Sequence, residues 1–222
     1  VLGWRRDHVP ERPRGVPVEI RPDWVCEILS TNRSNDVVKK KRIYHRHRIP
    51  HYWIIDPVDG TANFTDGKPE FAVMVALVQS GVTQAGWIHD PLSNRTAMAK
   101  RGEGAWMSGQ RLQVAQPCDL AEMTGAFYSK RTLSRLAEAV KRRICTGCAA
   151  FDYLGTLTGQ SHFVLFTRLM PWDHAAGVLI HAEAGGYSQL TDGRTYAPLP
   201  MEGVFIAAND ETSWQAVKDL VD

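Results

Sequence analysis

The chain has 222 residues, of which 44% are hydrophobic and 23% charged, a composition typical of a globular protein and unlike that of a disordered chain. No apolar run approaches the ~20 residues of a membrane-spanning helix, and the Arg-rich start lacks the apolar region of a signal peptide. Because no such apolar run occurs, we expect no membrane association. The four cysteines are too few and too scattered for a disulfide-stapled scaffold, so we expect a reducing, cytoplasmic location.

The first part of the chain differs from the rest in charge. Residues 1–52 carry 12 Lys and Arg against 6 Asp and Glu, whereas residues 53–222 carry 14 against 18. The pattern in this part predicts a strand over 23–30 and a basic helix over 36–47. The difference in charge indicates different histories or partners for the two parts, and the resemblances given below divide the chain into a small α/β fragment (1–52) and a main domain (53–222).

The main domain opens on an apolar run, Trp53 to Ile55, which predicts a buried strand. The sequence Asp56-Pro57-Val58-Asp59-Gly60-Thr61 follows at once. Because proline lacks an N–H and has a fixed φ, we expect the strand to end at Pro57. Two carboxylates three residues apart then lie where a strand meets a turn, and carboxylate oxygens are natural ligands of Mg²⁺.

Gly60 and Thr61 add a second feature to this turn. Glycine permits a close backbone approach, and Thr61 offers a hydroxyl and an amide at an expected helix start. Free backbone amides at such a position suit a phosphate group. An Asx-turn without any ligand is the structural alternative for the same residues.

Beyond residue 70 the pattern alternates strands and helices, which predicts a layered α/β fold. The helix over 171–184 carries Asp173 in its first turn and ends in a glycine pair, and an amphipathic helix is expected over 132–144. The other expected strands are 71–79, 83–89, 95–101, 124–128, 161–166, 187–190 and 203–208, and the other expected helices are 148–157 and 211–221.

Two motifs, Asp56-Pro-Val-Asp59-Gly-Thr61 and Trp172-Asp173-His-Ala-Ala-Gly177, resemble those of the inositol monophosphatase family, in that family's order. The resemblance runs from about residue 53 to the C-terminus. It implies the layered α/β sandwich of that family, here N-terminally incomplete. The implied activity is Mg²⁺-dependent hydrolysis of a small phosphate monoester such as an inositol phosphate, by a protein that commonly forms homodimers.

The same resemblance assigns roles to individual residues. Asp56 would bridge two Mg²⁺ ions, Asp59 and Asp173 would bind the second, and the Val58 carbonyl would add a backbone ligand. The amides of Gly60 and Thr61 would hold the phosphate, and Thr61 would orient the attacking water.

Two departures from the family pattern bear on activity and substrate. The family carries a Glu-Glu pair upstream, one glutamate of which binds the first metal, and no Glu-Glu occurs in this chain. Glu27 could substitute for it if its strand lies beside the strand at 51–55. Phe166 stands where inositol-specific members place a glutamate, and Arg168 after it is either a contact for a second anionic group or a surface charge.

Residues 3–57 resemble the later part of the Uma2 family, nucleases of the PD-(D/E)XK type, through Arg21-Pro-Asp23-Trp-Val-Cys-Glu27-Ile-Leu-Ser30 and His51-Tyr-Trp-Ile-Ile-Asp-Pro57. That resemblance would make Asp23 and Glu27 metal ligands and Lys40 the catalytic lysine, acting on nucleic acid. An edge carboxylate followed by a solvated basic helix explains the same residues. The alternatives to a phosphatase are thus a nuclease-like protein and a non-catalytic fusion remnant.

Two further groups of residues, a cysteine pair and four histidines, are of types that can bind metals. Cys145-Thr-Gly-Cys148 has the spacing of a zinc or redox motif, but no second pair accompanies it, which favours ordinary buried thiols. The scattered histidines at 89, 162, 174 and 181 are interpreted as surface or capping residues.

Overall fold

The computed structural model describes residues 2–3, 5–11, 21–28, 49–128 and 134–221, without the side chains of Glu27 and Ile28. The basic helix expected over 36–47, including Lys40, lies outside this range. Among the described residues, no helix combines the length and the apolar character that crossing a bilayer requires.

The larger of two sheets has its eight strands in sequence order, and only β2 and β3 pair in parallel. Because β2 pairs directly with β3, the predicted fragment and the main domain share this sheet, and the division at residue 52 stays a prediction. The strands are β1 (Leu2–Gly3), β2 (Trp24–Ile28), β3 (His51–Asp59), β4 (Ala72–Gln79), β5 (Val82–Asp90), β6 (Arg95–Lys100), β7 (Ala105–Met107) and β8 (Gln110–Arg111).

The second sheet has the strand order β10-β9-β11-β13-β12. Strand β9 pairs in parallel with both β10 and β11, whereas β13 pairs antiparallel with β11 and β12. The strands are β9 (Thr124–Phe127), β10 (Arg142–Ile144), β11 (Phe163–Leu169), β12 (Tyr187–Leu190) and β13 (Met201–Ala208).

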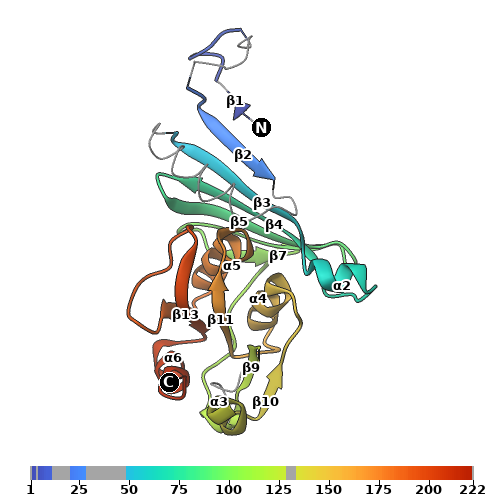
Figure 1. Cartoon of the computed structure of the whole chain (residues 1–222), viewed down its shortest axis with the longest axis vertical. Coiled ribbons are helices and arrows are strands. Elements are labelled where there is room, and N and C mark those ends of the chain that lie inside the picture. Colours follow the sequence, from blue (N-terminus) through green and yellow to red (C-terminus); the bar gives the residue numbers. More distant parts are fainter. Residues whose placement is uncertain (1, 4, 12–20, 29–48, 129–133, 222) are drawn as a thin grey trace.

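Helices α4 and α5 lie between the two sheets, and α3 and α6 lie beyond the smaller sheet (Figure 1). This arrangement confirms the predicted layered α/β fold. The helices are α2 (Thr61–Thr65), α3 (Ser134–Ala139), α4 (Ala149–Leu157), α5 (Pro171–Glu183) and α6 (Glu211–Lys218), with a short 3₁₀ turn at Leu120–Glu122.

Small residues allow α5 to pack tightly on both of its neighbours. A Cβ atom on Gly86 of β5 would lie 2.9 Å from the Cα of Ala176, so this glycine admits the helix onto the sheet. A Cβ on Gly177 would lie 2.2 Å from the ring of Tyr153 in α4. The Ala-Ala-Gly part of the second motif therefore fixes the position of α5 between the larger sheet and α4.

Two sequence predictions are corrected here. Strand β3 does not end at Pro57 but continues to Asp59, because its pairing with β4 shifts register between Asp56 and Asp59, and a bulge accommodates a residue without an N–H. The helix expected over 132–144 covers only Ser134–Ala139 in the described residues. Its last turns are replaced by β10, which adds a strand to the smaller sheet beside β9.

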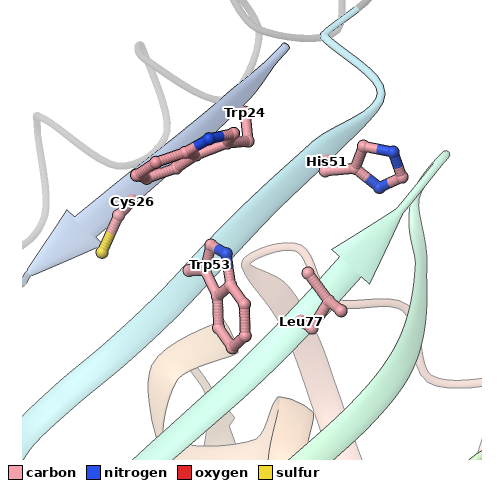
Figure 2. A pocket seen from close by; sticks show the side chains of 5 residues that line it. All are labelled: Trp24, Cys26, His51, Trp53 and Leu77. Atoms are coloured by element: carbon pink, nitrogen blue, oxygen red, sulfur yellow. The ribbon is translucent and has the colours of Figure 1, made fainter. Parts of the chain in front are cut away.

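The outer face of the larger sheet, which points away from α5, is also apolar. Ile55, Val75, Trp87, Met98 and Trp106 are register neighbours across five strands and are all half-buried or exposed. An open hollow on the same face lies over the first residues of β3, between β2 and β4 (Figure 2). It is lined by Trp24, Cys26, His51, Trp53 and Leu77 and contains no carboxylate, so we do not consider it the reactive site.

Candidate metal centre

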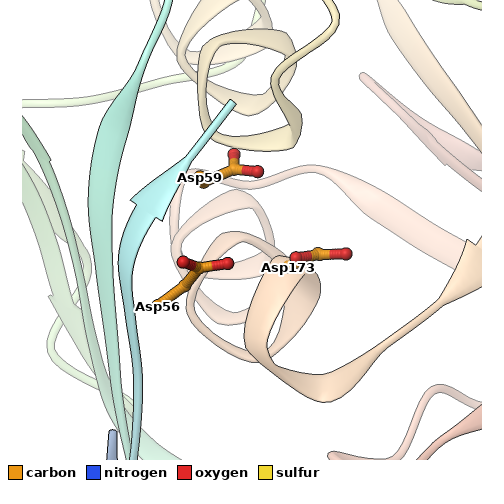
Figure 3. A group of neighbouring side chains, drawn as sticks. All are labelled: Asp56, Asp59 and Asp173. Atoms are coloured by element: carbon orange, nitrogen blue, oxygen red, sulfur yellow. The ribbon is translucent and has the colours of Figure 1, made fainter. Parts of the chain in front are cut away.

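Three carboxylates from two elements point into one space (Figure 3). Asp56 and Asp59 come from the end of β3, and Asp173 comes from the first turn of α5. One oxygen from each of them lies within 4.8 Å of the others. Asp56 is fully buried and Asp59 is 8% exposed, so two of these charges lie out of contact with bulk water. A buried group of carboxylates is costly unless a cation compensates it.

The bulge in β3 explains how Asp56 and Asp59 can face the same space. Residues three apart in a regular strand point to opposite faces of the sheet. Asp56 pairs with Met74 and Asp59 pairs with Ala72, so three steps along β3 match two steps along β4. The extra residue turns Asp59 towards α4 and α5, and the two carboxylates lie together.

The carboxylate of Asp59 is held by donors from its own turn and from α4. Its Oδ1 accepts the Gly60 amide at 3.0 Å, and its Oδ2 accepts the Ala150 amide at 2.6 Å and the Cys148 thiol at 3.1 Å. Burial raises the pKa of Asp59, the nearby charge of Asp56 raises it further, and these hydrogen bonds oppose that rise. A divalent cation would relieve the same repulsion.

Asp56 and Thr61 close the turn around Val58. The Val58 amide donates to Asp56 Oδ1 at 3.1 Å, and the Thr61 hydroxyl donates to the Val58 carbonyl at 2.8 Å. Gly60 has φ +78°, and a Cβ there would lie 2.6 Å from the Glu70 carbonyl oxygen, so only glycine fits. Thr61 then begins α2, as the sequence predicts.

The first turn of α5, which carries Asp173, is anchored through the buried residue that follows it. The next residue, His174, is 1% exposed, and its Nε2 lies 2.8 Å from the Arg168 carbonyl oxygen. That oxygen can only accept, so Nε2 carries the proton and Nδ1 accepts the Tyr153 hydroxyl at 3.2 Å. Burial lowers the pKa of His174 to about 4, which keeps the ring neutral.

The interpretation of His174 and His181 as surface or capping residues is therefore wrong. Both are buried, and burial lowers the pKa of His181 to about 4 as well. Histidine is amphipathic, and isolated occurrences in an apolar helix face do not reveal from sequence whether the ring points inward.

Sequence reasoning missed the polar contacts that hold the segment before α4, whose first residues contact Asp59. Thr146 Oγ1 lies 2.7 Å from the buried carboxylate of Asp152, and burial raises the pKa of Asp152 to about 6. The Asn63 side-chain amide donates to the carbonyls of Glu70 and Thr146, at 2.8 and 2.7 Å. The available signal was the Cys145-Thr-Gly-Cys148 stretch directly before α4, because residues at a helix start point their donors outward.

The structure describes little of the predicted nuclease site. Asp23 accepts the Arg5 amide at 2.7 Å and lies 3.0 Å from the His8 ring, so its carboxylate belongs to a local N-terminal contact. The backbone of Glu27 pairs with Ile54 of β3, which confirms that its strand lies beside β3. The side chain of Glu27 and all of Lys40 lie outside the described residues, so this site stays a prediction.

Comparison with known proteins identifies relatives of the whole described domain. The model of the inositol monophosphatase family matches residues 26–221. This match begins within β2, at Cys26, in the part that the sequence interpretation had assigned to a Uma2-like fragment, and the Uma2 resemblance has no support from it.

Two relatives and one solved structure illustrate the similarity. A fructose-1,6-bisphosphatase/inositol-1-monophosphatase of Thermotoga maritima is 36% identical over 60% of this chain and 54% of its own length. A putative Nus factor SuhB of Neisseria meningitidis serogroup B is 33% identical over 88% of this chain and 84% of its own length. A Thermotoga maritima IMPase structure superposes with a TM-score of 0.74 at 28% identity, over 90% of this chain and 74% of that one. The chain thus spans about half the length of the first of these relatives.

Proposed function

Because the chain belongs to the inositol monophosphatase family, we propose that it hydrolyses a small phosphate monoester of the inositol phosphate kind in a Mg²⁺-dependent reaction. The observation that carries this proposal is the meeting of Asp56, Asp59 and Asp173 within 4.8 Å. The three come from motifs more than 100 residues apart in sequence, and local turn structure alone does not require them to meet.

The donor set fits a hard divalent cation. All three side chains offer carboxylate oxygens, which Mg²⁺ prefers over nitrogen or sulfur. We propose that Asp56, Asp59, Asp173 and the Val58 carbonyl would hold Mg²⁺, with Asp56 shared if two ions bind. When bound, the metal would supply activation of a water nucleophile and stabilisation of charge on the leaving oxygen.

The turn after Asp59 supplies the remaining groups. The Gly60 amide donates to Asp59 and the Thr61 hydroxyl donates to the Val58 carbonyl. We propose that Thr61 orients the attacking water, since a hydroxyl that donates one hydrogen bond is of a type that also accepts them. We propose that the Thr61 amide holds the substrate phosphate, and that the Gly60 amide does so in addition to its hydrogen bond to Asp59.

Glu27 is the candidate for the missing upstream glutamate. Its strand runs parallel to β3 and its backbone lies opposite Ile54, two residues before Asp56. If Glu27 serves as a metal ligand, Glu27→Gln lowers phosphatase activity and raises the Mg²⁺ concentration for half-maximal rate. Unchanged values in a folded Glu27→Gln variant would refute this role.

The name of the Thermotoga maritima relative suggests the first two substrates, inositol 1-phosphate and fructose 1,6-bisphosphate. Phe166, in the place of a substrate-binding glutamate, packs against the rings of Tyr153 and His174. This position therefore offers no carboxylate to a sugar hydroxyl. The exposed Arg168 nearby is either a contact for a second anionic group or a surface charge, and comparing fructose 1,6-bisphosphate with inositol 1-phosphate distinguishes the two.

The decisive experiment measures phosphate release from both substrates and from a generic aryl phosphate, with Mg²⁺ and with EDTA. We expect Mg²⁺-dependent release that Asp59→Asn abolishes. No release from folded protein would reject the phosphatase and leave the non-catalytic remnant and the nuclease-like protein, which cleavage of a DNA substrate distinguishes. Light scattering of the same sample tests the proposed homodimer, and a cytoplasmic location is proposed on composition alone.

A further inference from the structure

The Cys145-Thr-Gly-Cys148 stretch places its two thiols in different environments. Cys145 is exposed, whereas Cys148 is 2% exposed. Cys148 precedes the first residue of α4, with extended backbone dihedral angles (φ −141°, ψ 116°), and its side chain does not cap its own helix. The thiol instead donates to Asp59 Oδ2 at 3.1 Å.

The backbone is shaped for this contact on both sides. A Cβ on Gly60 would lie 3.0 Å from Cys148 Cβ and 3.2 Å from its sulfur, so the glycine after Asp59 makes room for the cysteine. On the other side, the Cys148 amide donates to Thr146 Oγ1 at 3.2 Å. The sulfur therefore has little freedom to leave the carboxylate.

The thiol is enclosed beside the carboxylate that it contacts. Cys148 is 2% exposed, and the same Asp59 oxygen also accepts the Ala150 amide at 2.6 Å. The geometry therefore makes the Cys148 thiol a second donor to one oxygen of Asp59.

We infer that Cys148 is a positioning residue, whose thiol, together with the Ala150 amide, orients Asp59 for binding the metal ion. This inference rests on the proposed metal site. The two donors occupy Oδ2 and hold the carboxylate towards Asp56 and Asp173. Groups that orient a metal-binding side chain typically contribute 10- to 100-fold to affinity. A thiol is a weak donor and the Ala150 amide remains, so we expect about a tenfold loss on its removal.

The test measures Mn²⁺ binding by electron paramagnetic resonance in the full chain, with thermal unfolding followed in parallel. Cys148→Ala should bind Mn²⁺ about tenfold more weakly, and Cys148→Ser, which restores a donor, should recover most of the affinity. Cys145→Ala, the matched exposed cysteine, should bind as the wild type does. Phosphatase assays should show a higher half-saturating Mg²⁺ concentration for Cys148→Ala, with little change in KM for the substrate.

Three outcomes would overturn the inference. Equal Mn²⁺ affinity of wild type and Cys148→Ala, with only a lower unfolding temperature, would mean that the cysteine merely packs. A cadmium–thiolate absorption band in the wild type that is absent in Cys148→Ala would make the sulfur a ligand instead of a donor. No Mn²⁺ binding by the wild type would reject the proposed metal site itself, and so is distinguishable from the other two.

Discussion

The two ends of strand β3 use the same sheet for opposite purposes. At its start, Trp53 lies on the outer face, where its ring stacks on that of Trp87 with centroids 5.8 Å apart. At its end, Asp56 and Asp59 are buried beside a third carboxylate. Apolar contact stabilises the first end, whereas the second gathers charges that repel one another in the absence of a cation. The residues that stabilise the sheet and the residues of the proposed metal site therefore lie at opposite ends of one nine-residue strand.

The largest expected effect is on the carboxylate end. Asp59→Asn should lower metal-dependent phosphate release by at least about 100-fold, more than the loss of a supporting partner. Without metal the variant should be about as stable as the wild type, because Asn removes a buried charge whose pKa burial raises and keeps an acceptor for the Ala150 amide, which offsets the loss of the acceptor for the Gly60 amide. Phosphate release and urea unfolding in EDTA check both parts. A large loss of stability would show that the buried charge of Asp59 does not destabilise the metal-free protein.

A second prediction concerns pH, through Asp152. Burial raises its pKa from 3.8 to about 6, so between these values the folded state binds more protons than the unfolded state. Its contribution to stability is present at low pH and is lost as pH rises through about 6, by up to about 3 kcal/mol. Asp152→Asn should therefore gain stability relative to the wild type from pH 4.5 to pH 8. Urea unfolding at both pH values measures this, and a constant difference would contradict it.

The smallest expected effect is on the apolar end. Trp53→Ala removes the stacked pair with Trp87 and part of the wall of the hollow. Because the ring is only half-buried, we expect a loss of about 2 kcal/mol, below the 3–5 kcal/mol for a fully buried tryptophan. Urea unfolding measures the loss, and Mn²⁺ affinity of the folded variant should equal that of the wild type. Weaker Mn²⁺ binding would mean that the two ends are coupled.

The sequence was most informative where one residue type has a narrow physical meaning. Runs of apolar residues placed most strands of both sheets, and Asp173 in the first turn of a helix was confirmed, as was a helix start at Thr61. The meeting of Asp173 with the β3 carboxylates followed from a family resemblance and not from spacing, because it depends on how α5 packs between two sheets.

Other features were not predictable for identifiable reasons. Strand β3 continues through Pro57 because a bulge in its pairing with β4 accommodates the proline. A rule based on the proline alone takes no account of the partner strand. The donation from Cys148 to Asp59 joins residues 89 apart in sequence. Similarly, β10 forms where the sequence predicted the last turns of the helix over 132–144. Pairing with β9 outweighs the weak helix preference of these residues.

The bulge in β3 also makes the site depend on chain length. Asp56 and Asp59 share a face only because β3 has one residue more than β4 needs at this point. Inserting one residue into β4 beside Val73 would let regular pairing resume, three steps against three, and would turn the second carboxylate to the opposite face. A single added codon in β4 would thus convert the protein into a folded scaffold without a metal site, whereas many substitutions elsewhere in the strand would not. The matched lengths of β3 and β4 at this point, as much as the identity of the aspartates, are the heritable property on which the proposed activity depends.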